Sequence, residues 1–253
     1  MRAFLIITKY QFSNILKSKW IIFIMLFSIG LNIIFSNIFN DFQKFIISTN
    51  SIYLIIIPLI SVLFSGIYYY DNLKFYELLI GNFTNRKVII SSVIFTVIIS
   101  ISISFLLPAL IISIIYFGFS NYLIKFTFLH FLLILYFSLI SFFIAILNND
   151  KLKGISISII IYLIFSIFYD ALILFILLFF SDYPIENLIL YISSLNPILT
   201  IRTYFLKSLG FMENIGQIYH LISNFFLIST ILQIFICLII FILIVSYFEK
   251  KEF

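Results

Sequence analysis

The chain has 253 residues and a net charge of +5, and 64% of its residues are hydrophobic whereas only 10% are charged. Soluble domains carry about 25% charged residues, and a soluble protein of this size cannot keep so much apolar surface away from water. These values exclude a soluble enzyme, a nucleic-acid-binding protein and a disordered chain. The apolar runs continue for about 20 residues, which predicts an all-α integral membrane protein instead of a barrel of alternating strands.

Residues 1–19 predict an amphipathic helix that lies in the membrane interface. Basic and small polar side chains recur on one face and apolar side chains on another: Arg2, Lys9, Ser13 and Lys17 against Leu5, Phe12 and Leu16. Such a helix brings its lysines close to lipid phosphates, so membrane lipid is an expected partner. A plain basic flank that merely orients the first span is the alternative.

Six apolar runs predict six transmembrane helices in a single domain that covers residues 1–253. The runs occupy residues 20–39, 52–70, 88–117, 123–147, 155–180 and 224–248. Spans one to five thus lie within 20–180, and residues 224–253 hold span six and a short tail. Because the number of spans is even, both termini are expected on one side. Eleven of the 15 Lys and Arg residues fall on that side, so the positive-inside rule predicts cytoplasmic termini in a cell inner membrane.

The loop after the second span, residues 71–87, combines charged and apolar side chains in a segment that must leave the membrane. Gly81 and Asn82 indicate the end of a short helix there. Exposed apolar side chains on such a helix favour docking into a groove of a cytoplasmic partner, and a tight turn lying flat on the bilayer is the alternative. The residues expected at this site are Lys74, Phe75, Tyr76, Glu77, Leu78, Leu79, Arg86 and Lys87.

Asp170 lies near the middle of the fifth apolar run, where a carboxylate costs about 2.5–3.5 kcal/mol on insertion scales. It is expected to face the bundle interior or a cavity. Either it lines a substrate path or anchors a helix contact that changes during the transport cycle, or it is a structural group that is protonated or hydrogen-bonded. Candidate partners lie in the first span, although these residues can equally join helices to one another. They are Ser28, Asn32, Ser36 and Asn37.

Residues 181–223 form the long outer segment between the fifth and sixth runs. The segment mixes charged residues with apolar stretches, which predicts one or two short helices packed on the outer membrane face. Pro184 and Pro197 are expected where helices start or stop.

The sequence lacks the motifs of common hydrolases, of P-loop nucleotide binding and of paired cysteines. The single cysteine, Cys237, cannot form an internal disulfide, and the two histidines, His130 and His220, are far apart. We therefore expect no metal site and no cofactor bound by this chain.

The order of these features resembles that of the membrane subunits of ABC-2 type exporters. The shared features are the basic entry helix, the six spans, the charged turn with Glu77-Leu78-Leu79, and the Asn85-Arg86-Lys87 run into the third span. The resemblance implies the ABC-2 (type V) exporter fold, a second copy of this chain as partner, and two copies of a separate cytoplasmic ATPase. ATP and Mg²⁺ would bind to that ATPase, whose motion the inner turns would transmit to the spans.

A narrower resemblance is to the permeases that act in the maturation of nitrous oxide reductase. It rests on Ile57-Pro58-Leu59-Ile60, Tyr169-Asp170-Ala171, Leu195-Asn196-Pro197, Arg202 and Ser208-Leu209-Gly210-Phe211. This resemblance implies that Asn196, Pro197 and Arg202 lie in a segment facing a periplasmic maturation protein. It also implies that the cargo is a sulfur species for a copper-sulfide cluster.

Three other functions stay open. The chain could be a generic ABC-2 exporter of a lipid, a peptide or a drug. A membrane enzyme would need His, Asp or Glu clustered at the interface, and Asp170 is isolated in the sequence. A channel or an ATP-independent carrier would more often show repeated halves, and the sequence contains no internal repeat.

Overall fold

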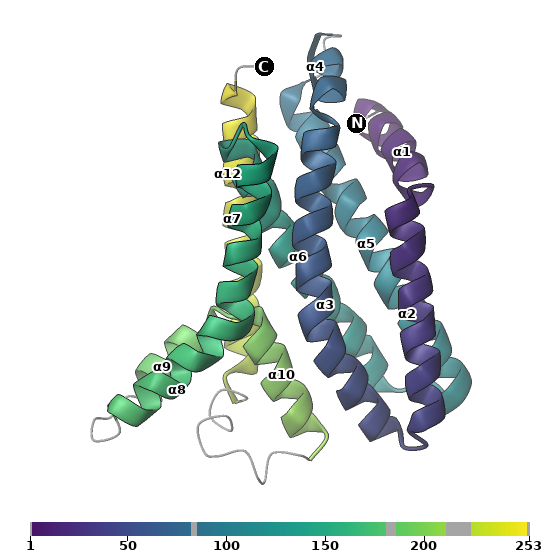
Figure 1. The fold of residues 1–253 in the computed structure, drawn as a ribbon, viewed down its shortest axis with the longest axis vertical. Helices are drawn as coiled ribbons and strands as arrows, with labels where there is room; N and C mark the ends of the chain where they lie inside the picture. Colours follow the sequence, from purple (N-terminus) through teal and green to yellow (C-terminus); the bar gives the residue numbers. More distant parts are fainter. Residues whose placement is uncertain (1, 82–84, 181–185, 211–223, 252–253) are drawn as a thin grey trace.

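The computed structural model describes residues 2–81, 85–180, 186–210 and 224–251, and every regular element in these ranges is a helix (Figure 1). The elements are α1 (Arg2–Leu16), α2 (Lys19–Ile38), α3 (Phe42–Asp71), α4 (Leu73–Gly81), α5 (Arg86–Phe117), α6 (Asn121–Leu147), α7 (Lys151–Leu163), the π-helical turn η1 (Ile164–Phe168), α8 (Tyr169–Phe179), α9 (Glu186–Ser194), α10 (Pro197–Ser208) and α12 (Phe226–Lys250).

Six helical segments of the described chain are long and apolar enough to cross a membrane: α2, α3, α5, α6, the α7–η1–α8 segment and α12. The prediction of an all-α fold is therefore confirmed for the described residues, and their six long apolar helices match the six predicted spans in number. The second helix begins at Phe42, ten residues earlier than predicted. Polar residues between 43 and 51 lower the local hydropathy, but Phe45 and Ile46 are buried in the core.

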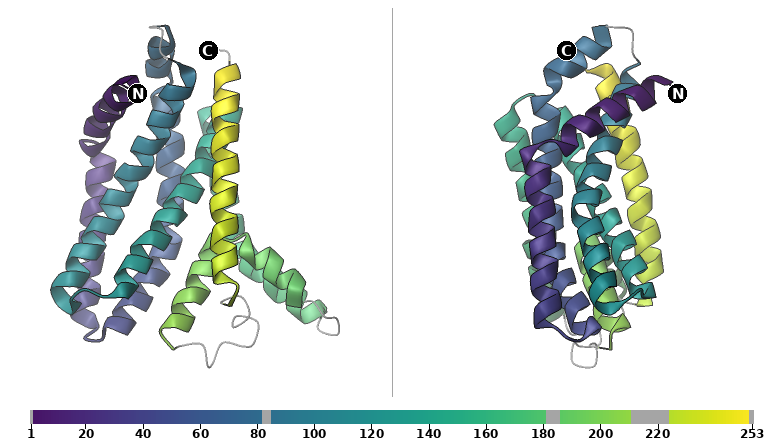
Figure 2. Two further views of the ribbon diagram at one scale, coloured as in Figure 1. Left: turned by 180° about the vertical axis from the view of Figure 1, so that it is seen from behind. Right: turned by 90° about the vertical axis from the view of Figure 1, so that its right-hand side faces the viewer.

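Both chain termini lie at the same end of the bundle, together with α4 (Figures 1 and 2). We call this the terminal end and the opposite one the far end. Three helices that start at the terminal end have a side-chain N-cap, in which Ser18, Asn85 and Asp150 each accept a hydrogen bond from a backbone N–H of the first turn.

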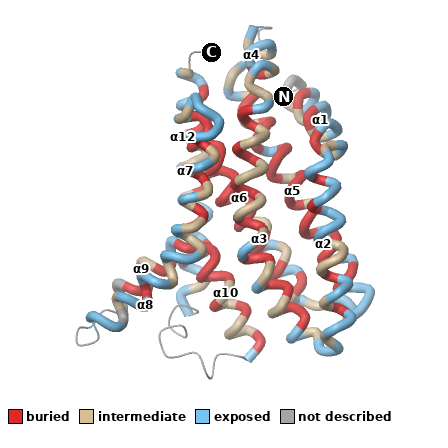
Figure 3. The backbone as a smooth tube through the Cα atoms, viewed as in Figure 1, coloured by how far each residue is buried: buried red, intermediate tan, exposed pale blue. Residues whose placement is uncertain are grey.

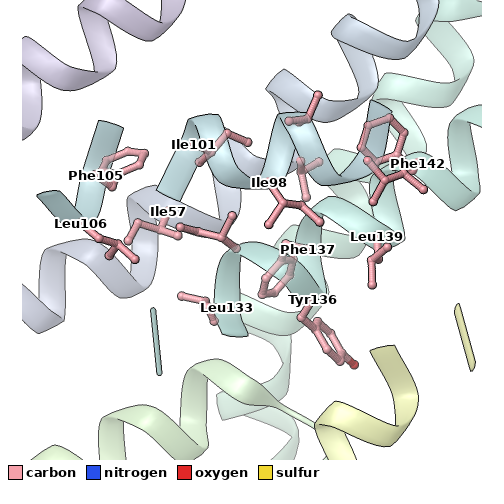
Figure 4. Close-up of a cluster of buried hydrophobic side chains, with 14 of the residues drawn as sticks. Ile57, Ile98, Ile101, Phe105, Leu106, Leu133, Tyr136, Phe137, Leu139 and Phe142 are labelled. Atoms are coloured by element: carbon pink, nitrogen blue, oxygen red, sulfur yellow. The ribbon is translucent and has the colours of Figure 1, made fainter. Parts of the chain in front are cut away.

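The core lies where α3 and α6 pack on each other and on α5 (Figures 3 and 4). Ile57, Phe105, Phe137 and Phe142 are fully buried there. Small residues bring the helices close, since Ser141 on α6 donates its hydroxyl to the carbonyl of Val62 on α3 at 2.6 Å. Such short interhelical contacts stabilise membrane bundles, in which burial from water contributes little.

The fifth span is helical from Lys151 to Phe179, as predicted for most of residues 155–180, but a π-helical turn interrupts its α-helical hydrogen bonding. The π-helical turn η1 lies between α7 and α8, and α8 diverges from the bundle with α9 beside it (Figure 1). A π-helical turn changes the hydrogen-bond register of the helix and redirects the helical turns after it. This bend sets the position of Asp170 at the start of α8.

Candidate functional site

Helix α4 at the terminal end has one anchored side and one exposed side. Tyr76 is fully buried, and its ring lies 6.0 Å from that of Tyr69 on α3 and 6.4 Å from that of Phe248 on α12. Burial raises the pKa of the Tyr76 hydroxyl well above its ordinary value. Of the residues predicted for docking, Tyr76 therefore points into the bundle and serves as the anchor of α4.

The exposed side of α4 carries Lys74, Glu77 and Leu78, and we call these three residues the α4 face. They share one side of the helix because their spacing is three and four residues. Leu78 is 68% exposed, which is a high value for a leucine beside two charges. Phe75 stacks on Tyr10 of α1 at 5.9 Å instead of pointing outward.

Arg86 and Lys87 attach the start of α5 to the end of α12. The Arg86 guanidinium donates to the carbonyls of Glu249 and Lys251, each at 2.8 Å, and the Lys87 amine lies 3.2 Å from the Glu249 carboxylate. The last carbonyls of a helix need partners of this kind. Both residues were predicted as part of the docking turn, and the structure assigns them contacts with α12.

Lys251 extends this attachment to α6. Its amine donates to the carbonyl of Ile146 at 2.9 Å, close to the end of that helix. Partial burial lowers the pKa of Lys251 from its ordinary value. The terminal end thus joins α4, α5, α6 and α12, and nothing in the local sequence pattern predicts this arrangement.

Helix α1 is helical, as predicted, and one of its sides packs against the bundle. Ile7, Gln11 and Ile15 are buried, and α1 packs chiefly on α5, across which it runs obliquely (Figure 2). Leu5, assigned to the apolar face, is 61% exposed. The position of α5 determines which side of α1 is buried. The sequence of α1 alone contains no information about that position.

Asp170 forms an ion pair at the far half of the bundle. Its carboxylate lies 2.6 Å from the guanidinium of Arg202 on α10, and the two side chains are 30% and 36% exposed. The partners expected from the first span were therefore wrong. The guanidinium offsets part of the cost of placing a carboxylate in an apolar helix.

Asn196 holds α10 against the interrupted fifth span. Its side-chain oxygen caps α10 by accepting from the N–H of Ile198 at 3.0 Å, and its amide donates to the carbonyl of Phe165 in η1 at 2.8 Å. Pro197 is the first helical residue, where a missing N–H costs nothing. The prediction of a helix start at Pro197 is confirmed, whereas Pro184 lies outside the described residues.

The described part of the outer segment contains two short helices, α9 and α10, which agrees with the one or two predicted. Helix α10 packs on α3, α6 and α12, and Leu199, Ile201 and Phe205 are buried. Gln233 of α12 donates to the carbonyl of Ser194 at 3.1 Å and to the Thr200 hydroxyl at 3.0 Å. Sequence reasoning missed Gln233, although a lone amide inside an apolar span is itself a signal.

Asn32 belongs to a separate polar cluster that joins α2, α3 and α5. Its amide donates to the Tyr53 hydroxyl at 2.7 Å. Ser28 shares a 2.7 Å hydrogen bond with the same hydroxyl and donates to the carbonyl of Phe105 at 3.0 Å. These residues therefore have the interhelical role that was the alternative to pairing with Asp170.

Among the residues that the structure describes, no group of three or more His, Cys, Asp or Glu side chains could hold a metal ion. A scan against protein-family models finds no match, and neither does a search of curated proteins. The function is therefore inferred from the geometry of the two ends of the bundle and from the resemblance in sequence.

Proposed function

We propose that this chain is the membrane subunit of an ATP-driven ABC-2 type exporter. The observation that carries the proposal is α4, a short helix outside the span, anchored by Tyr76 and exposing Lys74, Glu77 and Leu78. A charged and apolar face on a firmly held helix is suited to a groove of a partner protein. The proposed partner is a cytoplasmic ATPase, and the terminal end is then cytoplasmic.

In this mechanism, two copies of the chain form the membrane unit and two ATPase subunits dock on the α4 faces. Closure of the ATPase pair around ATP displaces α4. Tyr76 contacts Phe248, and Arg86 holds the end of α12, so the displacement reaches α12. A packed helix moves as a rigid element, and Gln233 links α12 to the turn between α9 and α10. The far half of the bundle therefore moves when the ATPase pair closes.

For the cargo we propose a sulfur species, transported in the maturation of a copper-sulfide enzyme. Support comes from the resemblance to the permeases of nitrous oxide reductase maturation. Three of the residues that carry this resemblance, Asp170, Asn196 and Arg202, lie close together where α10 contacts η1 and α8. A generic lipid, peptide or drug exporter is the alternative within the same class. A gene for an ATPase beside this one would favour the class, and genes for a copper reductase and its periplasmic maturation protein would favour the sulfur cargo.

Charge reversal on the α4 face tests the docking role. Glu77→Arg should reduce ATP-driven transport by about tenfold or more, because a misplaced charge at a protein interface costs several kcal/mol. The measurement is transport and ATP hydrolysis by the purified complex in vesicles. Lys153→Glu is the matched control, since Lys153 is exposed at the same end but lies on α7. Unchanged transport in Glu77→Arg, or an equal loss in both variants, would contradict the docking role.

A further inference from the structure

A groove of about 410 Å³ opens between α2 and α3 at the terminal end of the bundle. It exists because α2 packs mainly on α5 and touches α3 only lightly. The walls are apolar along Phe23, Ile60 and Phe64. From Ile60 to Asp71 the groove follows α3 for about 16 Å, at 1.5 Å per residue, which matches one leaflet of a hydrocarbon core about 30 Å thick.

The mouth of the α2–α3 groove carries opposite charges on its two sides. On the α2 side, Ser18 lines the mouth between the exposed Lys17 and Lys19, where the positive end of the helix dipole lies. On the α3 side, Asp71 lines the mouth. Its carboxylate accepts from Lys151 at 2.5 Å, and its side chain remains 54% exposed.

Two aromatic residues complete the mouth. Trp20 and Tyr68 line it, and Trp20 is 65% exposed. Trp and Tyr are the residues that gather at the headgroup level of a membrane, and the face of an indole attracts a cation. The groove therefore combines an apolar slot of leaflet depth with a zwitterionic, aromatic mouth.

We propose that the α2–α3 groove binds a phospholipid whose headgroup carries both a phosphate and a primary ammonium, of the phosphatidylethanolamine type. The acyl chain lies along Phe23, Ile60 and Phe64, and the phosphate lies at the start of α2. The ammonium donates to the carboxylate of Asp71. A choline headgroup has no N–H to donate, and an anionic headgroup without an ammonium offers Asp71 no cation, so both should bind more weakly.

Trp20 makes the site directly observable, because it is the single tryptophan of the chain. Bromine atoms on an acyl chain quench indole fluorescence at close range. The full chain would be reconstituted in phosphatidylcholine vesicles that contain increasing fractions of brominated phosphatidylethanolamine, phosphatidylcholine or phosphatidylglycerol. Trp20→Phe provides the background signal.

Brominated phosphatidylethanolamine should quench Trp20 at the lowest lipid fraction, with an apparent affinity about tenfold above that of the other two lipids, as expected for one additional charge-assisted hydrogen bond. Equal quenching by the three lipids would overturn the proposal, because it would mean unselective contact with the bilayer. Stronger quenching by phosphatidylglycerol would also overturn it, because Asp71 would then have no role.

A pair of variants separates the carboxylate from its ion pair with Lys151. Asp71→Asn removes the negative charge and should abolish the preference for phosphatidylethanolamine. Lys151→Gln breaks the same ion pair but leaves the carboxylate, so the preference should persist or increase. A preference retained in Asp71→Asn, or lost equally in both variants, would contradict the role of Asp71. None of these outcomes depends on an ATPase, so the result is separate from the proposed transport function.

Discussion

Asp170 brings a carboxylate into an apolar span, and Arg202 meets it from α10 at 2.6 Å. The sequence shows the cost of this carboxylate but not its partner, because Arg202 lies 32 residues away in a segment expected outside the membrane. The pair forms only because α10 packs into the bundle and the π-helical turn redirects α8. At the residue scale, polar residues in apolar runs are thus recognisable in sequence, whereas their pairing depends on tertiary structure.

The ion pair predicts a coupling energy that a double-mutant cycle can measure. Asp170→Asn and Arg202→Gln should each destabilise the chain, and the double variant should lose less than the sum, with a coupling of about 1–2 kcal/mol. The measurement is unfolding in detergent micelles. Lys44→Gln, an exposed position at the same end, should change stability by less than about 0.5 kcal/mol. Additive effects of the two substitutions would show that the pair contributes nothing.

At the scale of elements, hydropathy predicts the spans well, because the length and apolar composition of each run are properties of the local sequence. The start of α3 is missed because polar residues such as Gln43 and Lys44 precede Phe45 and Ile46, which are nevertheless buried. The buried side of α1 includes the polar residue Gln11, which is only 2% exposed, and the sequence pattern does not identify this side. In both elements, a neighbouring helix determines burial, and no local pattern encodes that neighbour.

Helix α12 connects the two ends of the bundle, and its Gln233 forms hydrogen bonds with Ser194 of α9 and Thr200 of α10. Gln233→Leu roughly keeps the side-chain size but removes both hydrogen bonds. The backbone hydrogen bonds of α10 should therefore break transiently more often. Backbone hydrogen exchange over residues 197–208 should accelerate by about fivefold to tenfold, as expected for a loss of about 1 kcal/mol.

The matched control for Gln233→Leu is Ser229→Ala on the same helix. Ser229 is buried, and its hydroxyl donates to the carbonyl of Phe225 one turn before it in the chain. This substitution should leave exchange in α10 unchanged. Unaltered exchange in Gln233→Leu would mean that the contact does not hold α10.

At the scale of the whole molecule, the terminal end gathers the features that a partner would use. The α4 face is exposed, Tyr76 anchors it, and Arg86 ties the same region to α12. The far end has the interrupted span and the pair formed by Asp170 and Arg202. Because the two ends differ in this way, we propose that the ATPase acts on the terminal end and that the far end changes conformation in response.

Purification of the full chain from its native membrane would show whether an ATPase is its partner. An ATP-hydrolysing subunit should copurify in equal copy number, identified by mass spectrometry, and Leu78→Asp on the α4 face should weaken this association by about tenfold or more. The complex should also contain two copies of the chain. Transport of the cargo with no ATPase bound would rule out the proposed exporter function, and an ATPase that binds equally well to the Leu78→Asp variant would rule out docking on the α4 face.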